Sequence, residues 1–257
     1  MKSIYTGCCG FPCARSRYYK LFSVVELQNT FYDLPSVEWA LSTRKEAPEG
    51  FKFVVKAWQV ITHPHTSPTW KKMKKKPGGE LTNYGFLKPT RENIEAFSKV
   101  LEIAKALDAE ILVLQTPPSM PYNAESIAWI KKFFEEVSGL VNNKVLVGWE
   151  ARGAWASAKE LREILEKYDI IHVVDILRTR PVYKHSKGIM YIRLHGLGPG
   201  EVNYSYNYTD EDLRKLIEIL SEEDFATAYV MFNNVKMLEN GLRFKELLRE
   251  AESFTVY

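Results

Sequence analysis

The sequence has little cysteine and lacks any long apolar run. Its three cysteines, Cys8, Cys9 and Cys13, lie within six residues; they form neither a disulfide framework nor the paired C-x-x-C units of a structural zinc site. We expect reduced thiols, with a Cys9 to Cys13 bridge or a redox role as the alternatives. No signal-peptide pattern and no apolar stretch of about 20 residues occurs. We therefore expect a cytoplasmic protein with no membrane partner.

Two nucleotide-binding motifs are also missing. Neither G-x-G-x-x-G nor a phosphate-binding P-loop is present, so we expect no dinucleotide cofactor. Neither sign of charge predominates: the net charge is only +3, and the run "KKMKKK" at 71–76 holds five lysines, without which the remainder would carry −2. A lysine run is usually a solvated loop, but it can also attract phosphate groups.

What the sequence does contain is a regular alternation of strand and helix patterns. Eight short β-branched or aromatic runs each end in a polar residue and a loop signal. They are "SIYTGCC" from Ser3, "VVELQ" from Val24, "FKFVVKA" from Phe51, "ILVLQTPP" from Ile111, "VLVGWEAR" from Val145, "IIHVVD" from Ile170, "IMYIRLHG" from Ile189 and "AYVMFNN" from Ala228.

Helical periodicity fills most of the intervals between these runs. Helices are expected over 36–47, 90–107, 126–137, 157–168, 209–220 and 242–251, with Thr90 and Thr209 as N-caps. The connections after the first and sixth strands are weak helix candidates, because the latter contains Pro181. Eight strand–helix units predict an α/β fold, a single (β/α)8 TIM-like barrel over residues 1–257 that is somewhat distorted.

One long interruption lies between the third and fourth strands. Residues 62–89 are rich in proline, glycine and lysine and show little periodicity. In a barrel this insertion follows the carboxyl end of a strand, where barrel enzymes keep their active sites. We expect it to act as a lid over that face, with a disordered surface loop as the alternative.

The strand ends carry polar side chains that the period of two places on one face. Every strand from the second to the eighth contributes at least one: Glu26, Lys56, Gln115, Glu150 with Arg152, Asp175, Arg193 with His195, and Asn233. One polar strand end means little, but seven together contain more ionisable groups than a capped core requires. We expect a working site with ion-paired groups and shifted pKa values.

Three chemistries suit such a set. An acid/base hydrolase would use Glu26 and Glu150. A metal hydrolase would use Glu150, Asp175 and His195 as ligands for zinc, manganese or magnesium, although only one histidine is well placed. A Schiff-base enzyme would use Lys56.

The segment "YIRLHGLGPGEVNYSYNY" at 191–208 joins Arg193 and His195 to a glycine-rich loop and three tyrosines. Glycine lets backbone approach a ligand closely, and barrels often hold phosphate after the seventh strand. Tyr204, Tyr206 and Tyr208 are either a wall of the site or an aromatic face packed on the barrel rim.

Eight ordered motifs resemble one known family across nearly the whole chain. "VVELQNTFYDLP", "FKFVVKAWQVITH", "LQTPPS", "WEARGAW", "VVD", "YIRLHG", "YSYNYTDEDL" and "MFNN" are similar to landmarks of the domain of unknown function 72 family. The resemblance implies a TIM-like barrel with some similarity to the metal-dependent endonuclease IV group, and it implies no particular reaction. Departures are Cys9, Gly10 and Phe11 where many members have Ser-Gly-Trp, and Gln28 where Asn is common.

The resemblance places the family's polar landmarks on a defined set of residues. They fall on Glu26, Asn29, Thr30, Tyr32, Lys56, His63, Gln115, Glu150, Arg152, Asp175, Arg193, His195, Tyr204, Tyr206, Tyr208 and Asn233. As catalytic residues we predict Glu26, Lys56, Glu150, Asp175 and His195. As substrate-binding residues we predict His63, Gln115, Arg152, Arg193, Tyr204, Tyr206, Tyr208 and Asn233.

The leading functional hypothesis is an enzyme acting on an anionic substrate that carries phosphate, with metal-dependent phosphoester hydrolysis as one form of it. Lys56, Arg152, Arg193, the loop "GLGPG" and the lysine-rich insertion motivate it. The alternative is a protein that binds a nucleotide or single-stranded nucleic acid without transforming it, with the three tyrosines as a stacking platform.

Overall fold

The computed structural model describes residues 2–141 and 144–257. All eight predicted strands are confirmed: β1 (Lys2–Cys9), β2 (Val24–Leu27), β3 (Lys52–Lys56), β4 (Ala109–Gln115), β5 (Leu146–Glu150), β6 (Ile171–Val174), β7 (Ile189–Leu194) and β8 (Thr227–Phe232). A ninth short strand, β9 (Phe254–Val256), was not expected. The order of strands and helices along the chain is that of a (β/α)8, TIM-like barrel.

The six predicted helices are confirmed as α3 (Val37–Glu46), α5 (Arg91–Ala106), α6 (Ala124–Ser138), α7 (Leu161–Tyr168), α8 (Asp210–Glu222) and α9 (Met237–Glu250). The connection after the first strand, a weak helix candidate, contains the short helix α1 (Arg15–Leu21), and the sequence periodicity missed two others, α2 (Asn29–Tyr32) and α4 (Gln59–Thr62). Residues 175–188 follow β6 and are described in full, and they contain no helix. Pro181 in that segment has no N–H for a helical hydrogen bond.

Two predicted helix starts have the expected cap geometry. The Thr90 side chain accepts a hydrogen bond from the Asn93 N–H at the start of α5. At α8, Thr209 and Asp212 form a reciprocal capping box, each side chain accepting from the other's backbone N–H. Both caps satisfy donors that a helix N-terminus leaves without an internal partner.

The described residues form two compact units. The first contains the chain up to Glu26, Pro48–Lys52 and Ile171–Tyr257, and the second contains Leu27–Ala47 and Phe53–Ile170. The fold class is the one predicted, whereas the single-domain organisation stays a prediction.

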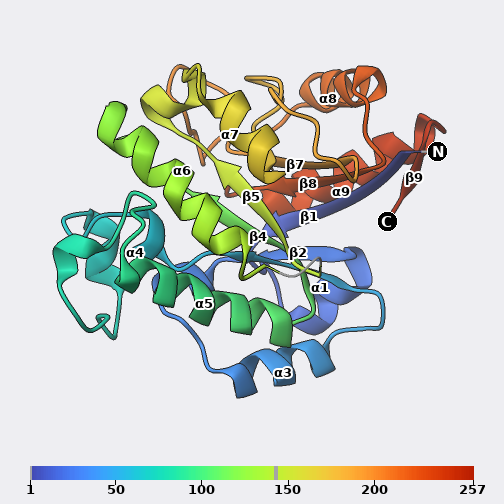
Figure 1. The fold of residues 1–257 in the computed structure, drawn as a ribbon. Helices are drawn as coiled ribbons and strands as arrows, with labels where there is room; N and C mark the ends of the chain where they lie inside the picture. The colour runs from blue at the N-terminus through green and yellow to red at the C-terminus, as the bar shows by residue number, and fades with distance from the viewer. Residues whose placement is uncertain (1, 142–143) are drawn as a thin grey trace. The chain divides into compact units, whose positions relative to one another are not determined.

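In the first unit, parallel strands lie side by side in the order β6, β7, β8, β1, and β1 also pairs with β2 and β9 (Figure 1). β7 shows the period of two directly. Ile192 and Leu194 belong to the apolar core that includes residues of α8 and α9, whereas Tyr191 and Arg193 on the opposite face both donate to Glu26. The predicted assignment of faces on this strand is therefore correct.

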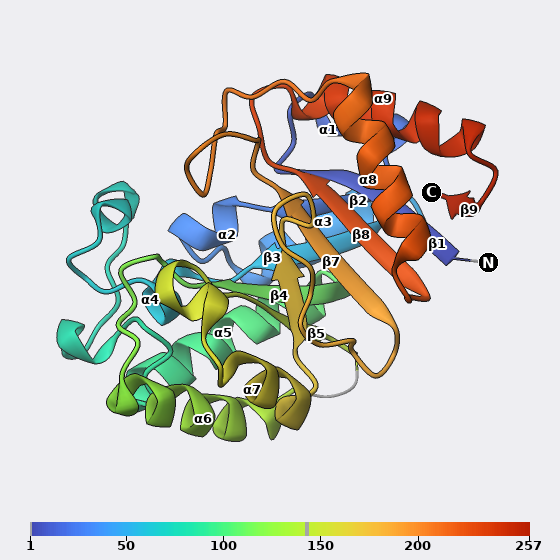
Figure 2. The ribbon, with the colours of Figure 1, turned by 90° about the horizontal axis from the view of Figure 1, so that it is seen from above.

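In the second unit, β3, β4 and β5 pair in parallel and α5 packs on β4. Figure 2 shows α5, α6 and α7 following one another along one side of this unit, and each contacts the next. The carboxyl ends of the strands carry Lys56, Gln115 and Glu150, and the latter two are register partners.

The long insertion is an ordered part of the second unit rather than a loose loop. It contains two 3-10 helices, η1 (Pro68–Lys72) and η2 (Leu81–Asn83). The backbone N–H groups of Gly85 and Phe86 donate to carbonyls of α4, and the buried Asn93 amide of α5 bonds both backbone groups of Gly85. The disordered alternative is therefore wrong, and the position of the insertion as a lid stays a prediction.

Two findings concern the expectations from composition. Cys8, Cys9 and Cys13, all in the described part of the chain, are present as thiols, and burial raises the pKa of Cys8 to about 12. Among the residues that the structure describes, no helix is both long and apolar enough to cross a membrane.

Candidate functional site

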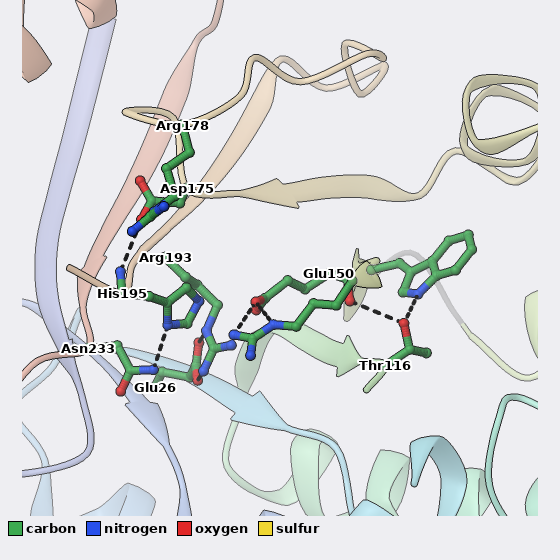
Figure 3. A network of polar contacts seen from close by, with 10 residues as sticks. Glu26, Thr116, Glu150, Asp175, Arg178, Arg193, His195 and Asn233 are labelled. Atoms are coloured by element: carbon green, nitrogen blue, oxygen red, sulfur yellow. Dashed lines mark hydrogen bonds and ion pairs between the residues drawn. The ribbon is translucent and has the colours of Figure 1, made fainter. Parts of the chain in front are cut away.

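A buried ion pair lies at the centre of the first unit's polar residues. Arg193 donates through Nε to Glu26 Oε2 at 2.9 Å and through Nη2 to Oε1 at 2.8 Å (Figure 3). Tyr191 donates its hydroxyl to Oε2 at 2.8 Å. Neither charged side chain is exposed. Burial, and then the Glu26 charge, raise the pKa of Tyr191 well above its ordinary value. Glu26 therefore accepts from two side chains whose protons are firmly held.

Asp175, which directly follows β6, connects backbone segments. Its Oδ1 accepts from the Leu177 N–H at 3.2 Å, and its Oδ2 accepts from the His195 N–H at 3.1 Å. The Arg178 guanidinium lies 3.7 Å from Oδ2. This predicted catalytic carboxylate thus links the end of β6 to the end of β7.

His195 and Asn233, both predicted site residues, are in contact. Asn233 Nδ2 lies 3.0 Å from His195 Nδ1 (Figure 3). The Tyr204 ring stands edge-on to the imidazole with 6.2 Å between ring centroids. The ends of β7 and β8 therefore bring together three residues that the sequence separates by up to 38 positions.

The glycine-rich loop uses several of its backbone groups internally. The Gly196 N–H donates to the Tyr208 hydroxyl at 2.7 Å, and the carbonyls of Gly196 and Gly198 accept from Arg178. Gly196 has φ +83°, and a Cβ there would overlap the Asn203 carbonyl oxygen. The turn thus requires glycine for its own geometry, and these backbone groups already have partners.

The three tyrosines of this segment differ in environment. Tyr208 is 4% exposed and belongs to the apolar core, and burial, more than the Asp175 charge, raises its pKa. Tyr206 donates to Asp212 Oδ2 at 2.8 Å beside the α8 capping box, whereas Tyr204 is 46% exposed. Their predicted substrate contact stays a prediction, and only Tyr204 shows a large exposed ring.

In the second unit, Glu150 and Arg152 form an ion pair after β5. Arg152 Nε and Nη2 lie 2.7 and 2.6 Å from Glu150 Oε1, and the two side chains are 11% and 7% exposed. The Glu150 carbonyl accepts from the Thr116 N–H at 3.1 Å, and Thr116 in turn accepts from the Trp149 indole (Figure 3). β4 and β5 are thereby tied together where the ion pair sits.

Lys56 and His63 meet on the ring of Phe31. The Lys56 ammonium lies 4.1 Å from the ring centroid, and the His63 ring stands edge-on at 5.1 Å. Burial, followed by the charges of Lys56 and Arg152, lowers the pKa of His63 to about 3. The imidazole is therefore neutral near pH 7 and lies in a region of positive potential.

The structure also identifies contributors that the sequence argument missed. The Phe31 ring contacts both Lys56 and His63. Thr116 accepts a hydrogen bond from Trp149 and so links β4 to β5, and Arg178 donates to a carbonyl of the glycine-rich loop. Thr116 follows the predicted Gln115 directly, so the period-of-two rule passed over it. Arg178 lies in the helix-free segment after β6, where no pattern indicated a role.

The predicted metal ligands belong to different units, Glu150 to the second and Asp175 with His195 to the first. Within the described ranges, no group of three or more His, Cys, Asp or Glu side chains is arranged to hold a metal ion. The Asp175 oxygens accept backbone N–H groups. The assignment of Glu150, Asp175 and His195 as metal ligands stays a prediction.

The element order and the polar strand ends together define an α/β protein of the TIM-barrel class with ionisable groups at the carboxyl ends of its strands. The chain belongs to the DUF72 family: the model described as "Protein of unknown function DUF72" matches residues 14–255.

Solved structures agree with this assignment. A DUF72 family protein from Enterococcus faecalis V583 is 18% identical with a TM-score of 0.68, over 97% of this chain and 98% of that one. A second, from Thermotoga maritima MSB8, is 23% identical with a TM-score of 0.65, over 96% and 99%. The IOLI protein with a bound zinc atom is 11% identical with a TM-score of 0.55, over 98% and 100%. These likenesses show the fold, and among curated proteins none matches this chain.

Proposed function

We propose that the protein is an enzyme whose substrate carries an anionic group, phosphate first, bound at the strand ends of the second unit by Lys56 and Arg152. The observation that carries the proposal is the charge around His63. Two cations act on this histidine strongly enough to help lower its pKa to about 3, and the carboxylate paired with Arg152 is that of Glu150. Cationic side chains beside a neutral imidazole can donate charge-assisted hydrogen bonds to a substrate anion.

The first unit supports the choice by contrast. Arg193 is paired with Glu26, and Arg178 lies beside Asp175, so each arginine has a carboxylate next to it. The glycine-rich loop, an obvious candidate for phosphate, uses the Gly196 N–H for Tyr208. Arg152 is paired in the same way with Glu150, so pairing alone does not separate the two units. We assign the anion to the second unit because its cations lie beside the neutral His63.

Two groups of the second unit suit acid/base chemistry on a bound anion. Glu150, 6% exposed, is a carboxylate that could accept a proton. His63 is a neutral imidazole, which can donate a hydrogen bond to a developing negative charge without being a cation. Hydrolysis of a phosphoester is the reaction we put first, because positioning and charge stabilisation supply most of its catalysis.

Titration calorimetry with inorganic phosphate tests the binding step. We expect Lys56→Gln and Arg152→Gln each to weaken binding about tenfold, equivalent to about 1.4 kcal/mol. Arg91→Gln is the matched control, because Arg91 is an exposed arginine of the second unit, 87% exposed in its ion pair with Glu95. Equal affinity in wild type and both site variants would refute the proposed site.

Turnover is tested on a panel of phosphomonoesters and phosphodiesters. Glu150→Gln should retain anion binding within about threefold and reduce turnover by a factor of about 100 or more, the usual contribution of a general acid or base. Metal analysis of the purified protein, with and without added manganese or zinc, tests the separate prediction of a metal at Glu150, Asp175 and His195. Binding without turnover of any ester would leave a binding protein rather than an enzyme.

A further inference from the structure

The lysine-rich part of the insertion is held in a defined position. Trp70 is only 4% exposed, and its indole Nε1–H donates to the His63 carbonyl at 3.1 Å. Met73 lies three residues further on and is 8% exposed. These two buried side chains fix the segment to the second unit, so its lysines project from an anchored backbone.

Asp33 holds the same segment from the other side. It directly follows α2, and its Oδ1 accepts the backbone N–H of Lys74 at 2.8 Å and that of Lys75 at 3.3 Å. A charged acceptor of two N–H groups makes strong hydrogen bonds. The side chains of Lys71, Lys72, Lys74, Lys75 and Lys76, here called the lysine rim, are all exposed.

A pair of touching aromatic rings connects the lysine rim to the proposed anion site. The Lys72 ammonium lies 5.4 Å from the centroid of the Tyr32 ring. Tyr32 packs edge-to-face on Phe31 with 5.1 Å between ring centroids. The Lys56 ammonium lies 4.1 Å from the centroid of the Phe31 ring. The lysine rim and the Lys56 site thus lie on neighbouring rings within one compact unit.

The local charge is strongly positive. The lysine rim has five cations in six residues, and the acid that holds its backbone, Asp33, supplies a single negative charge. Like charges on neighbouring residues repel one another, and a multivalent anion relieves that repulsion. A single phosphate at Lys56 would leave that repulsion in place.

We propose that the lysine rim is a second anion-binding site beside Lys56 and Arg152, and that the ligand is a chain of two or more linked phosphates. This inference rests on the proposed function, because it assigns one end of the chain to the Lys56 site. The shared chemistry is the linear polyphosphate, which occurs free and as the phosphate chain of a nucleoside polyphosphate. The contacts that carry the inference are to charge alone, so it assigns no role to a nucleoside base.

The test compares inorganic phosphate, inorganic tripolyphosphate and a nucleoside triphosphate by titration calorimetry at low and high salt. The rim variant is Lys72→Gln with Lys74→Gln and Lys75→Gln, which retains the backbone groups that Asp33 binds. The matched control is Lys45→Gln with Lys132→Gln and Lys159→Gln, three exposed lysines of the second unit outside the rim. Lys56→Gln reports on the proposed site itself.

We expect wild type to bind tripolyphosphate at least tenfold more tightly than phosphate. The rim variant should lose about tenfold in tripolyphosphate affinity and much of its salt dependence, because exposed charges are screened by salt. Its affinity for phosphate should stay within about twofold. A nucleoside triphosphate that binds like tripolyphosphate indicates recognition of the phosphate chain alone, and tighter binding indicates that the nucleoside form is the ligand; either supports the inference.

Two results would overturn it: unchanged tripolyphosphate affinity in the rim variant, or an equal loss in the control variant. Failure of the proposed function looks different. In that case Lys56→Gln leaves the affinities for phosphate and tripolyphosphate unchanged, while the rim variant still binds tripolyphosphate more weakly. The lysine rim would then be an anion-binding site that does not depend on Lys56. If wild type binds none of the three phosphates, both proposals are wrong.

Discussion

The charged strand ends of the two units differ in their neighbours. In the first unit, Arg193 and Glu26 are wholly buried in a bidentate pair, with Tyr191 as a further donor. In the second unit, Glu150 and Arg152 also form an ion pair, with side chains 7% and 11% exposed, but Lys56 and Arg152 act on a neutral histidine. A fully buried pair is suited to holding structure, whereas cations beside a neutral imidazole are suited to binding a ligand.

The largest expected effect comes from breaking the buried pair of the first unit. Arg193→Met leaves the Glu26 carboxylate buried without its guanidinium, which should lower the free energy of unfolding by about 3–5 kcal/mol. Urea-induced unfolding measures it. Arg91→Met, which removes an exposed pair, is the control and should cost less than about 1 kcal/mol.

The double variant Glu26→Gln with Arg193→Met sharpens this result. Removing both charges should recover part of the loss, because no unpaired charge then remains buried. If Arg193→Met lowered the free energy of unfolding no more than Arg91→Met, the buried pair would not stabilise the fold as its burial indicates.

A smaller effect is expected in the second unit, where His63 should make the free energy of unfolding depend on pH. The pKa of His63 is about 3 in the folded protein against an ordinary 6.5, so the unfolded chain binds an extra proton between these values. The contribution of His63 is fully present above pH 6.5 and is lost as pH falls toward 3, with a slope of up to about 1.4 kcal/mol per pH unit.

Unfolding free energies of wild type and His63→Gln between pH 7 and 4 measure this contribution. The difference between the two proteins should shrink or reverse as pH falls. A constant difference for His63→Gln would contradict the neutral, buried imidazole.

The smallest effect should distinguish the tyrosines of the first unit. Tyr208→Phe removes the hydroxyl that accepts from the buried Gly196 N–H, which should cost about 1–3 kcal/mol in unfolding free energy. Tyr204→Phe, at a 46% exposed ring, should change it by no more than about 0.5 kcal/mol. Equal effects of the two substitutions, measured by urea unfolding, would remove the distinction between a structural and an exposed tyrosine.

Much of the fold was predictable because its signals are local. Ile192 and Leu194 alternate with Tyr191 and Arg193, and that alternation alone assigns the faces of β7. Thr90 and Thr209 begin helices for reasons contained within four residues. Short elements such as α2 and α4 lacked a full period, so the pattern could not reveal them.

The candidate site was predictable as a set of residues but not as a set of contacts. The sequence placed Glu26, Arg193, Glu150 and Arg152 at strand ends, and it indicated ion pairs among them. It could not show that Arg193 pairs with Glu26, 167 positions away. Nor could it show that Gly196 bonds to Tyr208 and makes the glycine-rich loop a structural element.

By itself, then, the sequence determined the order of strands and helices, the caps, the faces of the strands and the residue types at their ends, since each depends on neighbours a few positions apart. Only the tertiary structure decided which charges neutralise each other, that His63 is neutral, and that Asp33 and Trp70 anchor the lysine rim. Those properties depend on burial and on distances between segments remote in the chain, and both arise only when the segments pack.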